Sequence, residues 1–280
     1  MDYIFHPQTA VELRRLLQQQ ASSILLSGAE GSGKRTAAFY LSEKLLGKPP
    51  VKDIDLHIIS PDKKNSISIQ AVREIRQRIK LKQTHSNKAQ KITRIVIIEN
   101  AHVLHEEAQN ALLKTLEEPP AGTVFILTAI RQRDLLPTVI SRVASCDIRP
   151  ITFEQATSLA PKADSKKITQ AYHLSGGNLG LFLAIVNDNT EHELIGSMAI
   201  AKELLASSKY QRMLAVDKLQ ADSLLLQRVL ACMKRILEYK LYIAKDVSIA
   251  RKIECCVQAE KDITAHVNKK LVITDFLAEI

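Results

Sequence analysis

The sequence predicts an α/β domain with a largely parallel sheet, followed by a region made only of helices. Two observations predict this fold class. Strand-like and helix-like runs alternate through the first half of the chain, and the strand-like runs disappear after about residue 151. The strand-like runs are also apolar and β-branched without polar alternation, which is typical of strands covered on both faces.

Five segments of the first half are expected to form strands, at 23–27, 56–60, 94–99, 123–129 and, shorter than the others, 145–150. Helices are expected between them, at about 34–46, 68–83, 104–118 and 134–143. The helix at 104–118 has the clearest pattern. Its apolar residues recur at helical spacing, Glu106 and Glu107 stand at its positive end, and Pro119 and Pro120 stop it.

Three domains are expected along the chain. Residues 1–150 form the α/β domain, residues 151–188 a small helical lid with a break at Gly176 and Gly177, and residues 189–280 a helical C-terminal domain. A chain of 280 residues is long enough for two or three separate cores.

The composition is that of an ordinary globular protein, with 46% hydrophobic and 25% charged residues. The net charge of +9 favours contact with a polyanion without identifying it. Charges interrupt the first apolar residues, so neither a signal peptide nor a membrane span is expected. The four cysteines form no zinc-binding set and suit a reducing compartment. We therefore expect a cytoplasmic protein.

A phosphate-binding loop is predicted between the first strand and the helix at 34–46. The segment LLSGAEGSGKRTAAFY, residues 25–40, contains the pattern G-x-x-x-x-G-K, whose nucleotide-binding candidates are Gly28, Gly31, Ser32, Gly33, Lys34 and the following Arg35. Glycines let backbone N–H groups turn toward a β-phosphate, and the helix N-terminus adds partial positive charge. Two cations at that positive end favour a bound anion such as ATP or ADP. A glycine-rich turn with two solvated cations would have the same sequence.

Two features argue against hydrolysis at this loop. Arg35 stands where a serine or threonine hydroxyl would hold Mg²⁺. The strand at 94–99 ends in Glu99 and Asn100 instead of two carboxylates; Glu99 could reach a metal, but Asn100 cannot accept a proton. The same two residues are also typical of a polar strand end that caps the next turn. The sequence therefore predicts a loop that binds nucleotide, holds Mg²⁺ poorly and does not turn over.

Two further segments carry a resemblance to a known family. NALLKTLEEPPAGTVFILTA at 110–129 and LLPTVISRV at 135–143 resemble the clamp-loader branch of the AAA+ ATPases, and within it the delta-prime type of subunit. The resemblance extends over residues 1–180 and, weakly, to VNKKLVITDFLAEI at the end of the chain. The run ALLKTLEEPP is much more specific than the phosphate loop alone.

The resemblance implies a subunit of a pentameric ring that opens a sliding clamp and places it on primer-template DNA during replication. The implied partners are gamma/tau-type and delta-type clamp-loader subunits of a bacterial DNA polymerase III, with the sliding clamp contacted indirectly. In that family an arginine from a Ser-Arg-Cys motif enters the ATP site of the neighbouring subunit. The motif stands here as Ser141-Arg142-Val143, so Arg142 is expected to act as an arginine finger in trans. A surface cation at a helix end would also fit this position.

The chain departs from the family in two further places. The segment GKPPVKDIDL at 47–56 has no cysteine where the family usually carries a four-cysteine module, so no zinc is expected. The lid segment SGGNLGLFLA at 175–184 has no arginine where the family usually senses nucleotide. The parts that would use the chain's own nucleotide are therefore depleted, whereas Arg142 is kept.

Contact with primer-template DNA is expected to involve its phosphate backbone. The segment AVREIRQRIKLKQ at 71–83 faces Val72, Ile75 and Ile79 inward and carries five basic residues: Arg73, Arg76, Arg78, Lys80 and Lys82. A solvated amphipathic helix is the simpler interpretation of this run. Aromatic residues make up only 4% of the chain, so base stacking is not expected and any binding should be salt-sensitive.

We therefore interpret the chain as a delta-prime-like clamp-loader subunit with an AAA+ domain, a lid and a helical collar domain, which hydrolyses no ATP by itself. Two alternatives stay open. One is an active gamma/tau-type ATPase in which Glu99 holds the metal, which Arg35, Asn100 and the missing lid arginine oppose. The other is a stand-alone basic DNA-binding protein with a vestigial AAA+ domain, which a size measurement would distinguish.

Overall fold

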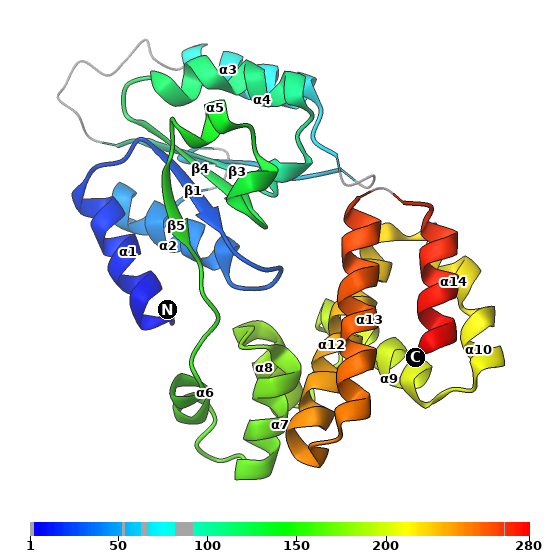
Figure 1. Cartoon of the computed structure of the whole chain (residues 1–280). Coiled ribbons are helices and arrows are strands. Elements are labelled where there is room, and N and C mark those ends of the chain that lie inside the picture. Colours follow the sequence, from blue (N-terminus) through cyan, green and yellow to red (C-terminus); the bar gives the residue numbers. More distant parts are fainter. Residues whose placement is uncertain (1–2, 52–53, 63–65, 82–91, 266) are drawn as a thin grey trace. The chain divides into compact units, whose positions relative to one another are not determined.

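The computed structural model describes residues 3–51, 54–62, 66–81, 92–265 and 267–280 (Figure 1). The chain divides into two compact units, Met1–Pro150 and Ile151–Ile280. The first unit contains the sheet. In the described part of the second unit every regular element is a helix.

The first unit is built on a five-stranded sheet of β1 (Ser23–Ser27), β2 (Leu56–Ile59), β3 (Arg94–Ile98), β4 (Thr123–Ala129) and β5 (Ala144–Asp147). All neighbouring strands pair in parallel, in the order β2-β3-β4-β1-β5, which confirms the predicted parallel sheet. Ser27 of β1 lies opposite Ala129 of β4, and Ile98 of β3 lies opposite Leu127. The carboxyl ends of these strands therefore meet at one edge of the sheet.

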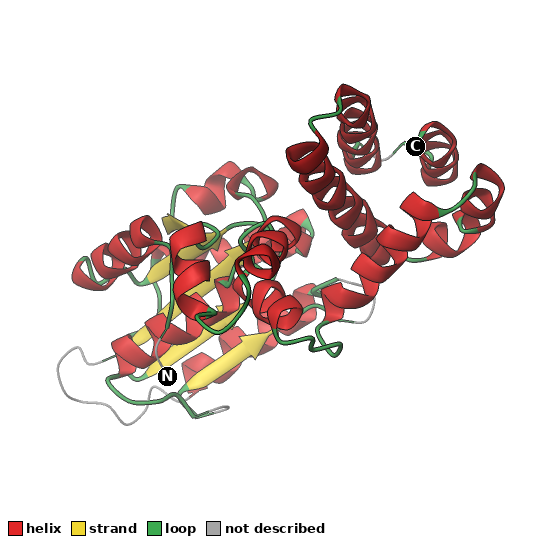
Figure 2. Ribbon diagram, turned by 90° about the horizontal axis from the view of Figure 1, so that it is seen from below, coloured by secondary structure: helices red, strands yellow, loops and turns green. Residues whose placement is uncertain are grey.

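Helices cover both faces of the sheet, and Figure 2 shows the strands between them. α1 (Pro7–Gln18) and α2 (Lys34–Leu46) cover one face, and α3 (Ile69–Leu81), α4 (Glu106–Glu117) and α5 (Pro137–Ile140) cover the other. Successive strand residues point to opposite faces: Ile24 and Leu26 of β1 pack with α1 and α2, whereas Leu25 packs on the α3–α5 side. Because both faces are covered, the strands have no polar alternation.

Two predicted helices differ from those of the structure. α4 begins at Glu106 because a 3-10 turn, η2 (Ala101–Val103), precedes it and Leu104 is extended. The predicted single helix at 134–143 is wrong. Another 3-10 turn, η3 (Gln132–Asp134), ends at the first residue of this segment. The four-residue α5 begins only at Pro137, because Pro137 disfavours the helical conformation in Leu136 before it.

Other boundaries shift less. The predicted strand at 145–150 is β5, which ends at Asp147, and residues 82 and 83 of the predicted helix at 68–83 lie outside the described part of the chain. α1 was not among the predicted helices. It begins after His6, whose ring Nδ1 accepts from the backbone N–H of Gln8, and Pro7 occupies its first turn.

The second unit begins with α6 (Phe153–Leu159), α7 (Ser165–Ser175) and α8 (Leu179–Val186). It continues with α9 (Glu193–Ala206), α10 (Lys209–Leu214), α11 (Val216–Ala221), α12 (Ser223–Ala244), α13 (Val247–Thr264) and α14 (Lys269–Glu279). α7 ends at Ser175 and is followed by Gly176 and Gly177, whose φ angles of 59° and 73° are left-handed, as expected after a helix C-terminus. The predicted break at these two glycines is therefore confirmed.

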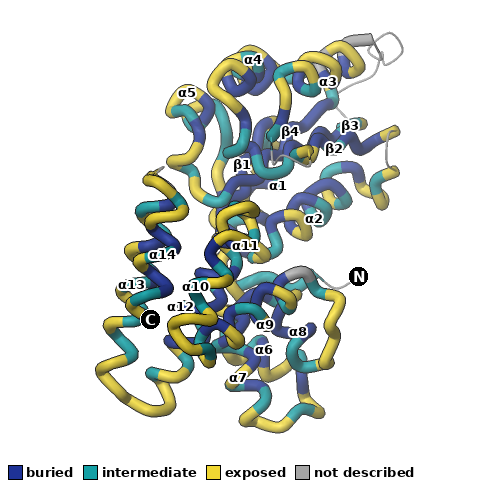
Figure 3. The backbone as a smooth tube through the Cα atoms, turned by 90° about the vertical axis from the view of Figure 1, so that its right-hand side faces the viewer, coloured by how far each residue is buried: buried dark blue, intermediate teal, exposed yellow. Residues whose placement is uncertain are grey.

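Two apolar cores hold the second unit together, and Figure 3 shows the buried stretches in dark blue. One core lies among α6, α7 and α8, around Phe182. The other surrounds α12, which packs on α7, α9 and α13. Leu174 of α7 and Leu181 of α8 belong to this second core, so residues 151–188 and 189–280 pack as one compact unit.

Two smaller findings concern the cysteines and the membrane. Cys255 and Cys256 lie on α13, the first half-buried and the second buried. No helix in the described ranges is both long and apolar enough to cross a bilayer.

Candidate functional site

The phosphate loop joins the carboxyl end of β1 to the N-terminus of α2. Gly31 and Gly33 have left-handed φ angles of 71° and 93°. Only glycine fits at Gly28, because a Cβ there would lie 2.6 Å from the carbonyl oxygen of Ile148 and 2.7 Å from Oγ of Ser32. Gly33 precedes α2 and supplies no side-chain cap, so the first N–H groups of the helix have no capping side chain.

The ammonium group of Lys34 folds back onto its own loop. Lys34 is buried, and its Nζ donates to the carbonyls of Gly28 at 2.6 Å and Ala29 at 2.7 Å. Burial lowers the pKa of Lys34 to about 8, and the carboxylates of Glu30 and Asp147 oppose this shift. An ammonium has three N–H donors, so one remains beyond these two hydrogen bonds.

Arg35, the next residue, forms an ion pair with Glu99. Nε of Arg35 lies 3.1 Å from Oε1 of Glu99, in a charge contact that lacks hydrogen-bond geometry. The other carboxylate oxygen of Glu99 accepts a hydrogen bond from Oγ of Ser60 at 2.7 Å. The guanidinium carbon of Arg35 also lies 5.8 Å from the ring centroid of Phe39, one helical turn further along α2. Both carboxylate oxygens of Glu99 are therefore engaged within the chain.

Asn100 follows Glu99 in a left-handed conformation, with φ 53°. Its backbone N–H donates to Oγ1 of Thr128, near the end of β4, at 2.9 Å. Asn100 precedes η2, but its side chain makes no capping hydrogen bond there. The strand end is thus anchored through the backbone of Asn100, and an amide stands where a water-activating carboxylate would be needed.

Three residues around the loop were not among the predicted site residues. Ser60 and Thr128 stand at the carboxyl ends of β2 and β4, the two neighbours of β3. His102, in η2, has its pKa lowered by burial and interacts electrostatically with Lys34 and Glu30. Ser60 and Thr128 could have been predicted as site residues from their positions at strand ends, but only with the order of the strands in the sheet already known.

These residues suit a phosphate group better than a divalent metal. Oγ of Ser32 is buried with no hydrogen-bond partner among the described residues, beside helix N–H groups that no side chain caps. Mg²⁺ instead needs oxygen ligands in near-octahedral geometry, and both oxygens of Glu99 are already engaged. In the described ranges no group of three or more His, Cys, Asp or Glu side chains could hold a metal ion. The residues fit ATP or ADP at the loop, and they do not fit Mg²⁺.

Arg142 lies just past the C-terminal end of α5. Its Nε donates to Oε2 of Glu117, the last residue of α4, at 3.0 Å. Its Nη1 donates to the carbonyl oxygen of Thr138 at 3.0 Å and to Oγ of Ser141 at 3.3 Å. The guanidinium is thus oriented by the short helix and by an exposed carboxylate, and it stays partly open to solvent. Glu117 is a partner that the sequence did not predict.

The basic helix predicted at 68–83 is α3. Val72, Ile75 and Ile79 are buried against α4 and the sheet, which confirms their predicted inward face. Arg73 and Arg78 are exposed. Lys82 and the side chains of Arg76 and Lys80 lie outside the part of the chain that the structure describes.

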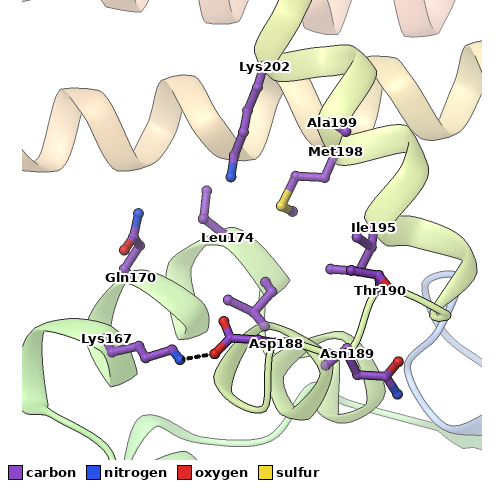
Figure 4. Close-up of a pocket in the computed structure, with 12 residues that line it drawn as sticks. Lys167, Gln170, Leu174, Asp188, Asn189, Thr190, Ile195, Met198, Ala199 and Lys202 are labelled. Atoms are coloured by element: carbon purple, nitrogen blue, oxygen red, sulfur yellow. Dashed lines mark hydrogen bonds and ion pairs between the residues drawn. The ribbon is translucent and has the colours of Figure 1, made fainter.

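The second unit also contains a cavity of about 370 Å³ between α7, α8 and α9 (Figure 4). Its lining is mostly apolar and includes Leu174, Ile195 and Met198. The ion pair of Lys167 with Asp188, at 2.8 Å, lies at one side of the cavity. The lining includes none of the residues of the phosphate loop, and no nucleophile paired with a base is found in it.

Comparisons with known proteins agree with the fold. The family model described as "DNA polymerase III, delta subunit" matches residues 5–152. The chain is 30% identical over 174 residues to DNA polymerase III subunit delta' of Escherichia coli K12, covering 60% of this chain and 51% of that protein. It is 29% identical over 155 residues to subunit tau of Bacillus subtilis 168, covering 50% of this chain and 27% of that protein. The chain thus spans about half the length of its Escherichia coli relative.

A solved structure extends the likeness over both units. A DNA polymerase III gamma subunit-related protein of Thermotoga maritima superimposes with a TM-score of 0.58 at 21% identity, over 97% of each chain. The parallel sheet with the helices that follow it is therefore the AAA+ fold predicted from the sequence. Because the family model covers more than half of the chain, this protein belongs to the delta-prime family of DNA polymerase III clamp-loader subunits.

Proposed function

We propose that this chain hydrolyses no ATP itself and supplies Arg142 to the ATP site of a neighbouring clamp-loader subunit. Its proposed partners are gamma/tau-type and delta-type subunits in a hetero-oligomer that places a sliding clamp on primer-template DNA. The observation that carries the proposal is the Arg35–Glu99 ion pair, which lies where a hydrolytic site would need a hydroxyl, a metal and a free carboxylate. The same ion pair speaks against an active gamma/tau-type ATPase.

The position of Arg142 supports the second half of the proposal. A guanidinium that enters a neighbour's site neutralises charge that develops on the transferred γ-phosphate. Arg142 follows a short helix in the first unit, and the carboxylate that holds it is exposed. An exposed ion pair is worth only about 0–1 kcal/mol, so a phosphate oxygen can replace Glu117 as the partner of Arg142 at little cost.

The proposed DNA contact is limited to the phosphate backbone. Arg73 and Arg78 are exposed on α3, whose apolar face packs on the unit. Such a helix can offer cations to phosphates without reading bases. Binding that uses it should weaken steeply as salt is raised.

The test is ATP hydrolysis by the reconstituted complex with its sliding clamp and primed DNA. We expect the isolated chain to hydrolyse no ATP. Arg142→Ala should lower turnover at the site that receives it by about 10³-fold, the lower end of measured arginine-finger effects. Arg133→Ala, at an exposed arginine of the nearby η3, is the matched control and should leave turnover unchanged.

Size-exclusion chromatography of the same samples separates catalysis from assembly. The Arg142→Ala variant should enter the complex as the unmodified chain does. Unchanged hydrolysis in an intact complex would refute the proposed finger. A chain that never joins gamma-type subunits would favour the stand-alone DNA-binding alternative.

A further inference from the structure

We infer that the Arg35–Glu99 ion pair replaces the divalent cation at the phosphate loop, so that this chain binds a polyphosphate such as that of ATP or ADP without metal. The inference concerns the ligand of the chain's own loop. It rests on the geometry of that loop and holds whether or not Arg142 acts on a neighbour.

Glu99 carries a negative charge close to the place proposed for the polyphosphate. A carboxylate beside a polyphosphate repels it unless a cation neutralises one of them, and in metal-dependent sites Mg²⁺ does so by bridging the two. Here the cation is part of the chain: Nε of Arg35 lies 3.1 Å from Oε1 of Glu99. The ion pair compensates Glu99 with or without a ligand, so a phosphate can approach the loop without a metal between them.

The ion pair also disfavours binding of Mg²⁺ at Glu99. To bind Glu99, Mg²⁺ would have to displace Arg35 from Oε1 or the Ser60 hydroxyl, 2.7 Å away, from Oε2. It would also lie close to a guanidinium that is always charged. The hydroxyl that would complete its ligand set is missing, because Arg35 occupies that position.

The loop still offers hydrogen-bond donors to a phosphate ligand. α2 begins without a capping side chain, Gly31 and Gly33 hold the loop in left-handed conformations, and Oγ of Ser32 is buried without a partner in the described part of the chain. The ion pair uses Nε of Arg35 and leaves the four N–H donors of Nη1 and Nη2. The N–H groups among them can only donate, which suits phosphate oxygens and gives a cation no ligand, and the Ser32 hydroxyl can donate as well.

The test is isothermal titration calorimetry of the full chain with ATP, once in excess MgCl₂ and once in EDTA at matched ionic strength. We expect the unmodified chain to bind ATP in EDTA at least as tightly as in Mg²⁺. Arg35→Thr restores the missing hydroxyl and frees Glu99, so its affinity should become about tenfold higher in Mg²⁺ than in EDTA, which corresponds to about 1.4 kcal/mol. Mn²⁺ immobilisation, followed by electron paramagnetic resonance with ATP present, should appear in that variant alone.

The matched control is Lys48→Thr. It removes the Lys48–Asp55 ion pair, which has a separation of 2.6 Å and side chains 56% and 12% exposed, close to the 68% and 13% of Arg35 and Glu99. Like the unmodified chain, this control should bind ATP at least as tightly in EDTA as in Mg²⁺.

Three outcomes would overturn the inference: binding by the unmodified chain that is about tenfold tighter in Mg²⁺, no binding of ATP under either condition, or metal indifference in a folded Arg35→Thr variant. The comparison on the unmodified chain decides the matter even where a variant does not fold. None of these outcomes depends on hydrolysis in the complex, so failure here is distinct from failure of the proposed function.

Discussion

Two arginines of the first unit are each paired with a glutamate, and the two pairs differ in what surrounds the carboxylate. Glu99, the partner of Arg35, is 13% exposed and also accepts the Ser60 hydroxyl. Glu117, the partner of Arg142, is 59% exposed. The N–O separations are almost equal, 3.1 Å and 3.0 Å, so distance does not distinguish the pairs.

We expect the burial of the carboxylate to decide which arginine can change partner, although Arg35 itself is 68% exposed and Arg142 32%. Solvent and salt screen an exposed pair, and breaking it returns both charges to water at little cost. Removing the partner of a mostly buried carboxylate leaves a poorly solvated charge, which costs considerably more. We therefore expect Arg35 to stay on Glu99, whereas Arg142 can move from Glu117 to a phosphate.

The largest expected effect tests the role of Arg142. Arg142→Lys keeps the positive charge but loses the planar fork that can bind two phosphate oxygens. Hydrolysis at the neighbouring site of the reconstituted complex should fall by about 10²-fold, less than in the alanine variant. Steady-state ATP turnover measures it, with Arg133→Lys as the control. Full activity of the lysine variant would mean that only charge matters at this position.

The next effect concerns the buried cation beside Arg35. Burial lowers the pKa of Lys34 from 10.5 to about 8, so charged Lys34 penalises the folded state. This destabilisation of the folded state is largest below about pH 8, and it decreases as the pH rises from about 8 toward 10.5. The free energy of unfolding of the unmodified chain should therefore rise by about 2 kcal/mol between about pH 7 and pH 9.5 relative to Lys34→Met.

Urea unfolding at both pH values measures this difference, and the methionine variant serves as the uncharged reference of similar length. A difference that does not change with pH would show that Lys34 keeps an ordinary pKa in the folded state. In that case the hydrogen bonds to Gly28 and Ala29 would compensate fully for its burial.

A smaller effect measures the two ion pairs directly. Double-mutant cycles with alanine at Arg35 and Glu99, and at Arg142 and Glu117, give the coupling energy of each pair. We expect about 1 kcal/mol for the first pair and less than about 0.5 kcal/mol for the second. Equal coupling energies would show that burial of the carboxylate does not distinguish the two pairs. A larger coupling energy for Arg142 and Glu117 would show that Arg142 is the more firmly held of the two arginines.

The smallest effect is expected for Glu117→Gln. If Glu117 only holds Arg142 in the absence of a neighbour, its neutral amide should change hydrolysis in the complex by less than about twofold. The readout is the same ATPase assay, with assembly checked by size. A loss as large as that of the Arg142→Lys variant would instead make Glu117 a residue that positions the finger.

Sequence reasoning succeeded where the deciding interactions are local. The strands at 23–27 and 123–129 and the helix at 34–46 have the predicted bounds, because apolar β-branched runs and a glycine-rich turn before a helix are properties of short segments. The predicted helix at 134–143 was wrong because the helical pattern was continued across Pro137. The effect of a proline on the preceding residue is also local, so that error was avoidable.

The sequence by itself determined that a loop of the pattern G-x-x-x-x-G-K precedes α2, that Arg35 follows its lysine and that Arg142 stands in a Ser-Arg-Val motif. Only the tertiary structure decided which groups meet these residues. The order β2-β3-β4-β1-β5 brings the ends of β2 and β3 together, so that Ser60 reaches Glu99, and the packing of α2 on the sheet adds Arg35. The physical reason is that each crossover returns the chain to the edge where strands begin, so that every parallel strand ends at the other edge of the sheet. Residues far apart in the sequence thus become neighbours, and no local pattern encodes their pairing.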